Sequence, residues 1–352
     1  MILDDMILRS GGWLGAVDST GIVISSRIRL ARNVAGAAFP GWAGEEERVR
    51  LAAQLRAALT EVPALRATTY LDMGDLNEVD RLFLTERHLI SAELAEKGRG
   101  SGVLFSDDEQ VAVMVNEEDH LRLQAMRPGM DLPGIWQQLD GIDSALEDQV
   151  SYAFSPTLGY LTACPSNVGT GLRASVMLHL PGLRFMNEVE PVAKGLQRIG
   201  LAVRGLLGEG TEASGNMYQV SNQITLGDSE ENTIRRLIEI VEEVVQHEEN
   251  ARLRLAEQQA AYLKDRVGRA YGILSYASLL TSEECMDLLS TLRLGQIFGL
   301  VRGLSVSAIN ELFVRTQPGH LQRIERRILS PEQRDQMRAG IARAVVRAAE
   351  LV

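Results

Sequence analysis

The chain has 352 residues, of which 45% are hydrophobic, and its formal net charge is −11. This acidic balance argues against a general affinity for DNA or RNA phosphates, and no apolar run is long enough to span a bilayer. The two cysteines, Cys164 and Cys285, lie far apart and form no C-x-x-C pair, so neither a disulfide framework nor a cysteine zinc site is indicated. A place in the reducing cytoplasm is expected.

Short apolar runs alternate with turns between residue 22 and about residue 225, and they indicate the strands of a sizeable sheet. The expected strands lie at residues 21–24, 67–71, 111–115, 160–163, 174–178, 201–203 and 218–222. Helical patterns occur between them, as at residues 45–59 and 189–199. The expected fold class is therefore α+β or mixed α/β.

The pattern becomes almost wholly helical from Asp228, which can cap a helix with Glu231 at its third position. Apolar residues then recur at helical spacing. A serine, a proline and a glutamine within residues 330–333 indicate a further helix start near the C-terminus. We expect a domain boundary near residue 251.

Arginines follow two of the expected strands. An extended chain would project Arg27 and Arg29 to one face, where two parallel guanidinium groups suit a polyphosphate. A solvated face with local ion pairs is the alternative. Arg204 follows another strand and precedes a glycine loop that carries the carboxylates of Glu209 and Glu212.

Three acids, a histidine and an arginine lie within residues 116–122, directly after the apolar run at 111–115. Functional residues cluster at strand exits in layered folds, so this segment is a candidate site. A charged helix start is the alternative, because acids favour a helix N-terminus. His88 is weaker evidence, since a packed or capping histidine is the more ordinary role.

The ten residues 164–173 combine a thiol, a compact polar turn and an arginine. The backbone N–H groups of such a turn can point one way and attract phosphate or carboxylate, and Arg173 would add a planar fork of donors. An ordinary glycine-rich turn before a strand is the alternative.

Together these segments resemble the ATP:guanido phosphotransferases, the phosphagen kinase superfamily, over about residues 22–251. The matching signatures are S-S-R-I-R at residues 25–29, N-E-E-D-H-L-R at 116–122, C-P-S-N-V-G-T-G-L-R-A-S at 164–175 and G-E-G-T-E at 208–212. Four ordered motifs make the resemblance specific. It implies a glutamine-synthetase-like α+β catalytic domain, with an antiparallel sheet flanked by helices.

The bacterial protein arginine kinases are the more similar branch of this superfamily. Relatives that act on small substrates carry a helical domain of roughly a hundred residues before the first motif, whereas this chain has a lead of residues 1–21. The catalytic domain is expected at 22–251 and a helical C-terminal domain at 252–352. The latter contains R-D-Q-M-R-A at residues 334–339, which matches the R-D-x-x-R-A motif of that branch.

The resemblance implies which residues act on the acceptor. Glu118 is the carboxylate expected to bind a guanidinium group, and Glu209 or Glu212 supplies the second carboxylate. Cys164 is expected beside the guanidinium, where nearby cations would favour its thiolate. A small buried hydrophobe is the alternative role for this cysteine.

The implied nucleotide is ATP with Mg²⁺, and no side chain is predicted as a metal ligand. The residues expected around the nucleotide are Ser25, Ser26, Arg27, Ile28, Arg29, His88, Arg122, Arg173, Ala174, Ser175, Val176, Met177, Arg204, Gly205, Leu206, Leu207, Gly208 and Glu209. Leu207 stands where relatives often have an arginine, so Arg204 is expected to take over that phosphate contact.

A second, allosteric site for phosphoarginine is implied in the C-terminal domain. Its expected members are Arg334, Asp335, Gln336, Met337, Arg338 and Ala339. Arg338 and backbone donors would hold the phosphate, and Asp335 the guanidino group. A helix face with local charge pairs is the alternative.

The implied activity is transfer of the ATP γ-phosphate to arginine side chains of proteins. Implied partners are protein substrates with exposed arginines, a zinc-binding activator protein and a Clp ATPase, in marking proteins for proteolysis and regulating the stress response. A homodimer is expected from the apolar C-terminal helices, and neither nucleic acid nor membrane is expected as a partner. The alternatives are a kinase of free arginine or another small guanidine, and a non-catalytic adaptor that binds nucleotide or phosphoarginine.

Overall fold

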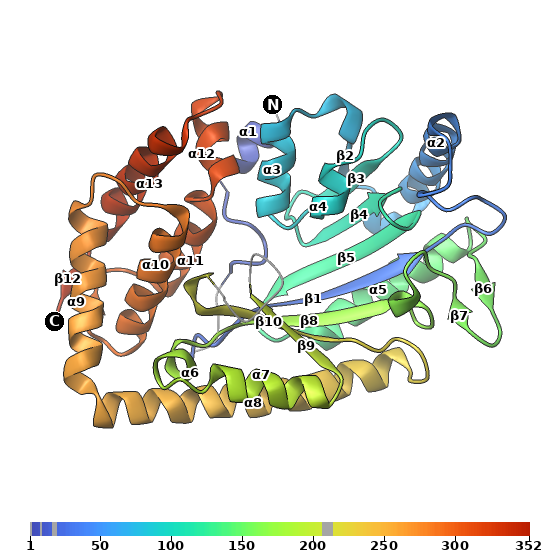
Figure 1. Ribbon diagram of the computed structural model, residues 1–352. Helices are drawn as coiled ribbons and strands as arrows, with labels where there is room; N and C mark the ends of the chain where they lie inside the picture. The colour runs from blue at the N-terminus through green and yellow to red at the C-terminus, as the bar shows by residue number, and fades with distance from the viewer. Residues whose placement is uncertain (1, 8, 16–19, 206–213) are drawn as a thin grey trace. The chain divides into compact units, whose positions relative to one another are not determined.

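The computed structural model describes residues 2–7, 9–15, 20–205 and 214–352 (Figure 1). The chain divides into two compact units. The middle unit comprises residues 26–175 and 221–238, and the terminal unit comprises residues 1–25, 176–220 and 239–352. Within the described ranges, no helix is both long and apolar enough to cross a membrane.

One eight-stranded sheet has the strand order β2-β3-β4-β5-β1-β8-β10-β9. The strands are β1 (Val23–Arg32), β2 (Thr68–Asp72), β3 (Gly102–Ser106), β4 (Val111–Val115), β5 (Leu121–Pro128), β8 (Leu172–His179), β9 (Leu201–Gly205) and β10 (Met217–Asn222). Strands β2 to β5 form an antiparallel meander, with Tyr70 opposite Leu104 and Met114 opposite Arg122. The antiparallel sheet implied by the resemblance is confirmed.

The middle unit adds helices and a short hairpin to its part of the sheet. They are α2 (Glu45–Glu61), α3 (Glu78–Glu86), α4 (Ala92–Ala95), α5 (Leu132–Glu147), β6 (Phe154–Ser155) and β7 (Gly159–Tyr160). The side chains of Asn77 and Ser91 accept hydrogen bonds from free backbone N–H groups at the starts of α3 and α4. Helix α5 buries Ile135, Leu139 and Ile142, and every residue of β4 is buried.

Two buried ion pairs join elements of the middle unit. Arg32 of β1 lies 2.6 Å from Asp143 of α5, and Arg87, at the end of α3, lies 2.5 Å from Glu109 in the β3–β4 turn. A buried charge is costly unless it is paired and hydrogen-bonded. These pairs therefore fix α5 and the end of α3 against the strands.

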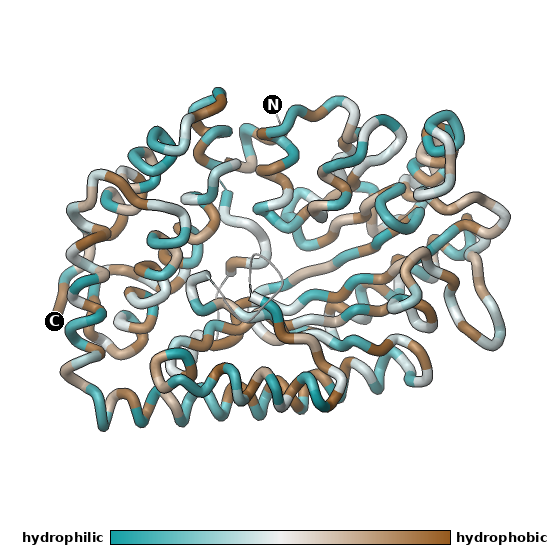
Figure 2. Tube along the Cα trace, viewed as in Figure 1, coloured by the Kyte–Doolittle hydropathy of each residue, from teal (hydrophilic) through white to brown (hydrophobic). Residues whose placement is uncertain are grey.

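The terminal unit is mainly helical. It contains α1 (Ile2–Ile7), α6 (Pro181–Phe185), α7 (Val189–Arg198), α9 (Ala260–Tyr276), α10 (Ser282–Ile297), α11 (Val306–Arg315), α12 (Pro318–Glu325) and α13 (Pro331–Val346), with the antiparallel pair β11 (Val301–Arg302) and β12 (Glu350–Leu351). Helix α8 (Glu230–Gln258) begins in the middle unit and continues in the terminal unit, without a break at residue 251. Hydrophilic and hydrophobic residues alternate along α8 (Figure 2), as the sequence pattern predicts.

Helix α10 is the core of the C-terminal helices, since residues 289–295 are all buried. Its N-cap Thr281 accepts a hydrogen bond from Glu284 N. Helix α13 begins with the expected cap, because Ser330 and Gln333 form a reciprocal capping box with proline at the first position. The predicted helix start at 330–333 is confirmed.

Several sequence-based boundaries are wrong. Arg27 and Arg29 lie inside β1 rather than after a strand, because β1 continues to Arg32. A turn follows β4 and leads into β5, which excludes the charged helix start. Ser229, not Asp228, caps α8, because its Oγ accepts from Asn232 N.

Candidate active site

The β4–β5 turn shows how the acid-rich motif at residues 116–122 folds. Asn116 has a left-handed φ of 52°, and its amide donates to Arg48 O and Gly100 O. The His120 Nδ1 accepts from Val34 N at 3.0 Å, and its Nε2 lies 3.0 Å from Ala38 O. Burial lowers the pKa of His120, which keeps the ring neutral for these bonds. Both residues therefore hold the turn rather than a ligand.

Two buried acids of this turn also accept hydrogen bonds, although the Oδ2 of Asp119 is buried without a partner among the described residues. Glu117 accepts from Arg122 Nη1 at 2.5 Å and from the hydroxyl of Ser91. Asp119 accepts from the Asn33 amide at 2.6 Å and from Ala163 N at 2.7 Å. Asp119 thereby ties the β4–β5 turn to the residue beside Cys164. Sequence reasoning missed this role, since the bond joins positions 44 residues apart.

Glu118 is the acid of the turn that remains accessible, with a third of its side chain exposed. Its Oε2 accepts from Arg122 Nη2 at 3.3 Å. Burial raises the pKa of Glu118, and the negative charges of Asp119 and Glu93 raise it further, against the effect of Arg122. A carboxylate with a raised pKa accepts a proton more readily.

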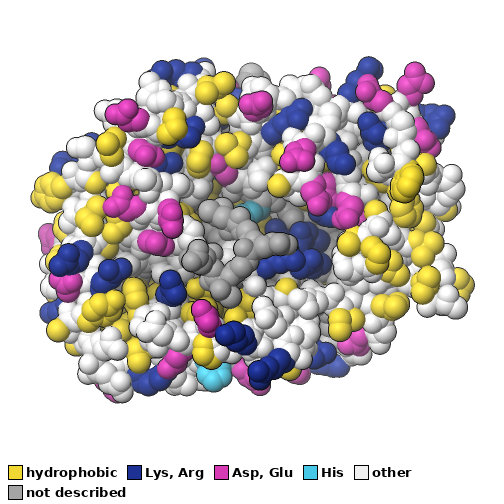
Figure 3. Space-filling view, viewed as in Figure 1, with side chains coloured by type: hydrophobic (Ala, Val, Ile, Leu, Met, Phe, Trp, Pro, Cys, Tyr) yellow, Lys and Arg dark blue, Asp and Glu magenta, His cyan; other side chains and the backbone are white. Residues whose placement is uncertain are grey.

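Four arginines of the middle unit influence one another: Arg27, Arg29, Arg122 and Arg173. Burial lowers the pKa of Arg27 to about 10, and repulsion by Arg173 and Arg122 adds to the effect. Burial also lowers the pKa of Arg29 well below its usual range, with repulsion from the other three arginines. Figure 3 shows a group of Lys and Arg side chains near the middle of the molecular face in view, with acidic side chains beside it. A polyanion would relieve this repulsion.

Strand geometry explains why Arg27 and Arg29 share a face. Successive side chains of a strand alternate between faces, and the neighbouring Ile28 and Leu30 are fully buried. Within the described part of the chain, no hydrogen-bond acceptor reaches the buried Nε of Arg29. A buried donor without a partner is costly, and a phosphate oxygen would satisfy it.

His88 lies close enough to Arg27 and Arg29 for their charges to act on it. Burial, followed by these two cations, lowers the pKa of His88 to about 3. Its backbone has a left-handed φ of 60°, and its carbonyl accepts from Gln124 Nε2 at 2.7 Å. The structure thus brings His88 to the arginines, which only the resemblance had indicated.

The turn at residues 164–171 does not form the expected anion-binding nest. The N–H groups of Asn167, Val168 and Gly169 donate to other backbone carbonyls, and Thr170 N donates to Thr225 O at 2.9 Å. Gly169 has a φ of 114°, and a Cβ there would lie 2.1 Å from Thr225 O. Glycine is required at residue 169 because a Cβ would clash with this carbonyl. The N–H groups of residues 167–170 are already used by carbonyls of the chain.

Cys164 is half-buried, and its Sγ lies 3.0 Å from the hydroxyl of Ser166. The adjacent Ala163 is held by Asp119, and Thr162 donates to Cys164 O at 2.8 Å. The thiol and Glu118 are therefore positioned by the same buried carboxylate. Cys285 is fully buried in α10, and burial raises the pKa of its thiol to about 11.

The remaining predicted nucleotide residues of β1 and β8 are mostly buried. Ser26 donates to Gly129 O and accepts from Asp131 N, both at 2.9 Å. Ala174 N donates to Asn222 Oδ1 at 2.8 Å, and Arg173 Nη2 lies 3.4 Å from Ser221 Oγ. The other buried members are Ser25, Ser175, Val176 and Met177. Asn222 and Ser221 thus support the site, a role that the sequence had not assigned to them.

Three comparisons with known proteins bear on this site. The model of the ATP:guanido phosphotransferase C-terminal catalytic domain matches residues 50–251, and that of the protein-arginine kinase McsB C-terminal domain matches residues 260–351. The chain is 46% identical to the protein-arginine kinase of Moorella thermoacetica over 96% of this chain and 98% of the relative. It is 44% identical to the protein-arginine kinase of Pelotomaculum thermopropionicum over 92% of this chain and 91% of the relative. The chain belongs to the protein-arginine kinases, within the ATP:guanido phosphotransferase family.

Solved structures of the family agree with this assignment. The duplicated taurocyamine kinase of Schistosoma mansoni matches with a TM-score of 0.60 and 30% identity, over 65% of this kinase and 33% of that chain. Lombricine kinase matches with a TM-score of 0.57 and 26% identity, over 69% of this chain and 70% of that chain. The fold class and family read from the four motifs are confirmed.

Part of the predicted kinase site lies in or beside the glycine loop. Arg204 is exposed near the end of β9 in the terminal unit, and Gly205 is buried. The predicted site residues that lie outside the described ranges are Leu206, Leu207, Gly208, Glu209 and Glu212. The choice between Glu209 and Glu212 therefore stays a prediction.

The R-D-x-x-R-A motif of this kinase begins in the first turns of α13. Arg338 is buried, and it donates to Thr316 O at 2.8 Å, Leu280 O at 2.7 Å and Asp335 at 2.6 Å. Arg334 donates to Leu329 O at 3.0 Å. The other members of the motif are Gln336, Met337 and the buried Ala339. In this conformation Arg338 holds three segments together, and phosphoarginine binding stays a prediction.

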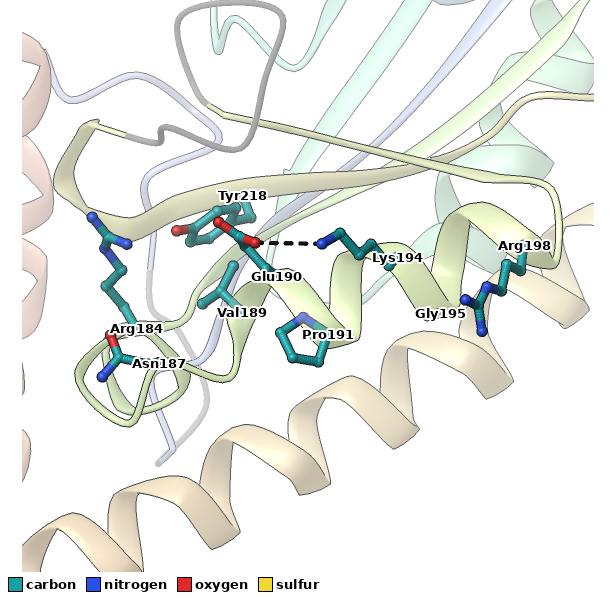
Figure 4. Close-up of a pocket in the computed structure, with 9 residues that line it drawn as sticks. All are labelled: Arg184, Asn187, Val189, Glu190, Pro191, Lys194, Gly195, Arg198 and Tyr218. Carbon is teal, nitrogen blue, oxygen red and sulfur yellow. Dashed lines mark ion pairs between the residues drawn. The ribbon is translucent and has the colours of Figure 1, made fainter.

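A separate cavity of about 790 Å³ lies in the terminal unit (Figure 4). Its lining is Arg184, Asn187, Val189, Glu190, Pro191, Lys194, Gly195, Arg198 and Tyr218. Lys194 lies 3.5 Å from Glu190, one turn away on the same helix α7. None of these lining residues was predicted for the nucleotide or the acceptor.

Proposed function

We propose that the chain transfers the γ-phosphate of ATP to arginine side chains of proteins. One observation carries the proposal: Arg122 belongs to the arginine group and also donates to the accessible Glu118 at 3.3 Å. A site for a polyanion and a site for a cation therefore adjoin within the middle unit. Membership of the protein-arginine kinases supports the same activity.

The phosphate half of the site is the group Arg27, Arg29, Arg122 and Arg173. Guanidinium groups present planar forks of donors that suit phosphate oxygens. In phosphoryl transfer the protein acts mainly by positioning and by stabilising charge on the transferred group. Preformed cations whose mutual repulsion is relieved by a triphosphate fit that task.

The acceptor half of the site is Glu118. A free guanidinium has a pKa above about 12 and is a poor nucleophile. Glu118 would accept a hydrogen bond from the guanidinium and take its proton as the new N–P bond forms. The bond between the γ-phosphorus and the β–γ bridging oxygen breaks, and ADP leaves with that electron pair. The products are phosphoarginine and ADP, with the proton on Glu118.

Two further groups complete the proposed acceptor half. Glu209 or Glu212 supplies the second carboxylate, and Cys164 lies next to the guanidinium. The bond from Ala163 N to Asp119 supports the position of Cys164, since Asp119 directly follows Glu118. A thiolate there would add a negative charge beside the guanidinium.

Mg²⁺ is proposed to enter with ATP, bound to its phosphate oxygens, where it neutralises part of their charge. Among the described residues, the carboxylates of Glu93, Glu117 and Glu118 lie within 4.8 Å of one another. Glu117 is already bonded to Arg122 and Ser91, and Glu118 is assigned to the acceptor. Because Glu117 and Glu118 already have these roles, an ion held by the ATP phosphates is a better assignment than an ion held by the three carboxylates.

The biological role is proposed from the resemblance to the bacterial protein arginine kinases. Phosphorylation would mark proteins for Clp-type proteolysis in the cytoplasm and regulate the stress response, with a zinc-binding activator protein and an allosteric phosphoarginine site at residues 334–339. A homodimer is part of this proposal. The net charge of −11 favours basic protein substrates.

The acceptor is tested by incubating the chain with ATP and Mg²⁺ and either a basic protein or free arginine. Acid-labile phosphate on protein arginines, found by mass spectrometry, is the expected result. Label on free arginine alone would favour a small-guanidine kinase. Nucleotide binding without transfer to either acceptor would favour the adaptor and contradict the proposal.

A further inference from the structure

One face of α10 carries three polar residues at intervals of three: Asp287, Ser290 and Arg293. Residues three apart on a helix lie on the same face. Ser290 and Arg293 are fully buried, whereas Asp287 is exposed. All three hydrogen-bond to segments outside the C-terminal helices, and all of these contacts lie within the terminal unit.

Ser290 is the centre of this polar row. Its Oγ accepts from the Asn216 amide at 2.8 Å and lies 2.8 Å from His179 Nε2. Asn216 ends the short turn Ser214–Asn216, and His179 ends β8. One buried hydroxyl of the C-terminal helices thus contacts two segments of the catalytic fold.

Arg293 determines how His179 bonds to Ser290. Its Nη1 donates to Gly21 O at 2.6 Å and lies 2.8 Å from His179 Nδ1. Burial lowers the pKa of His179 well below its usual range, and the charges of Arg293 and Arg252 add to this. Nδ1 of the neutral ring accepts from Arg293, so Nε2 carries the hydrogen that bonds to Ser290.

The Ser214–Asn216 turn is fixed tightly onto α10. Gly215 N donates to Asp287 Oδ1 at 2.9 Å. Gly215 and Asn216 both have left-handed φ angles, of 67° and 54°. A Cβ at Gly215 would lie 3.2 Å from Met286 O, so the backbone of the turn approaches that of the helix closely.

The position of this turn in the sequence gives the contacts a functional meaning. Ser214 directly follows residues 206–213, which carry Glu209 and Glu212. Asn216 directly precedes β10, whose Asn222 and Ser221 contact the backbone of Ala174 and the side chain of Arg173. In the sequence, the turn therefore joins the segment with the candidate carboxylates to β10.

We propose that Ser290 and Asp287 are positioning residues for phosphoryl transfer, because they hold the Ser214–Asn216 turn, which in the sequence joins the segment with the candidate carboxylates to β10. They touch neither ATP nor acceptor. The inference rests on the proposed function, and it makes α10 a functional part of the catalytic apparatus. Misplacement of a reacting group by about 1 Å can cost up to a hundredfold in rate.

The test compares Ser290→Ala and Ser275→Ala in the full chain. Both remove one buried hydroxyl from the C-terminal helices, but the Ser275 Oγ has no partner within the described residues. We expect Ser290→Ala to lower kcat about tenfold or more, with little change in the KM for ATP. Ser275→Ala is expected to match the wild type.

A second pair of variants uses the exposed Asp287, which folding tolerates more easily. Asp287→Asn keeps an oxygen acceptor for Gly215 N, whereas Asp287→Ala removes it. We expect the Asn variant to retain most of the wild-type kcat and the Ala variant to lose several-fold. Hydrogen exchange at residues 214–222 should become faster in Ser290→Ala and Asp287→Ala.

The outcomes separate this inference from the proposed function. A wild type that phosphorylates proteins, with unchanged kcat in Ser290→Ala and Asp287→Ala, would overturn only the positioning role. Lower unfolding midpoints with unchanged kcat would also overturn it. If the wild type transfers phosphate only to free arginine, the same variants are assayed with that acceptor. No transfer to either acceptor would overturn both proposals.

Discussion

Arg27 and Arg29 of the middle unit are used in the opposite way to Arg338 of the terminal unit, whereas the buried Arg32 and Arg87 of the middle unit are paired with acids. Burial lowers the pKa of Arg27 and of Arg29, and repulsion by Arg122 and Arg173 lowers both further. Arg338, in the terminal unit, is also buried, but it donates to two backbone carbonyls and to Asp335. Burial alone therefore does not identify a ligand-binding arginine.

Arg338 and Arg29 differ in the hydrogen-bond acceptors that surround them. Carbonyl oxygens satisfy Arg338 at fixed positions, so it joins three segments of the fold. The Nε of Arg29 is buried without an acceptor among the described residues, and the charges of three arginines act on the side chain, opposed by that of Glu117. We infer two kinds of arginine: the first, which backbone carbonyls satisfy as at Arg338, stabilises the protein, and the second, which has a buried donor without an acceptor as at Arg29, binds phosphate.

A large effect on catalysis is expected from removing an arginine of the second kind. Arg29→Gln should lower kcat/KM for ATP by about a hundredfold, because it removes a preformed charge from the proposed triphosphate site. Steady-state phosphorylation of a basic protein measures this. Arg66→Gln, at an exposed position of the middle unit, is the control and should leave kcat/KM unchanged.

Removing an arginine of the first kind should affect stability. Arg338→Ala leaves the carbonyls of Thr316 and Leu280 without this donor, and we expect a loss of about 2–4 kcal/mol in the free energy of unfolding. Arg269 pairs with Asp265 on the surface of α9 at 2.8 Å, with 70% of its side chain exposed. Arg269→Ala should cost less than about 0.5 kcal/mol. Equal losses in urea unfolding would contradict the distinction.

A smaller effect is expected from His88, on which the charges of Arg27 and Arg29 act. Its pKa is about 3 in the folded chain, against about 6.5 when unfolded. Between these values only the unfolded chain binds the proton, so His88 makes stability fall as the pH is lowered below about 6.5.

The variant His88→Asn tests this pH dependence. Asparagine tolerates the left-handed φ at this position and does not titrate. We expect its unfolding midpoint to fall less than that of the wild type between pH 7 and pH 5. The same substitution at the exposed His247 should leave the wild-type slope. A steeper fall of the unfolding midpoint in His88→Asn than in the wild type would contradict the predicted direction of the pH dependence.

Local pattern predicted much of the sheet and several helix starts. The apolar run at 111–115 coincides with β4, and the serine, proline and glutamine at 330–333 cap α13 as expected. Local pattern failed where charged side chains interrupt a strand. Arg27 and Arg29 sit on the half-buried face of β1, so the apolar run appears to end several residues before Arg32, where the strand ends.

Contacts between distant segments could not be predicted from the sequence. The four motifs identified the family, but the bonds that hold them in place join Asp119 to Ala163 and Asn216 to Ser290. The glycine turn at 164–171 was misread for the same reason. Its N–H groups donate to nearby carbonyls and to Thr225 O, which only the folded chain brings within reach.

The most direct test of the two-part site is to measure ATP binding and phosphate transfer together in Glu118→Gln, with Glu96→Gln as the exposed control. We predict that Glu118→Gln binds ATP with a Kd close to that of the wild type, while transfer to protein arginine falls at least a hundredfold. Glu96→Gln should match the wild type in both. Retained transfer in Glu118→Gln, or an equal loss of ATP binding, would contradict the account.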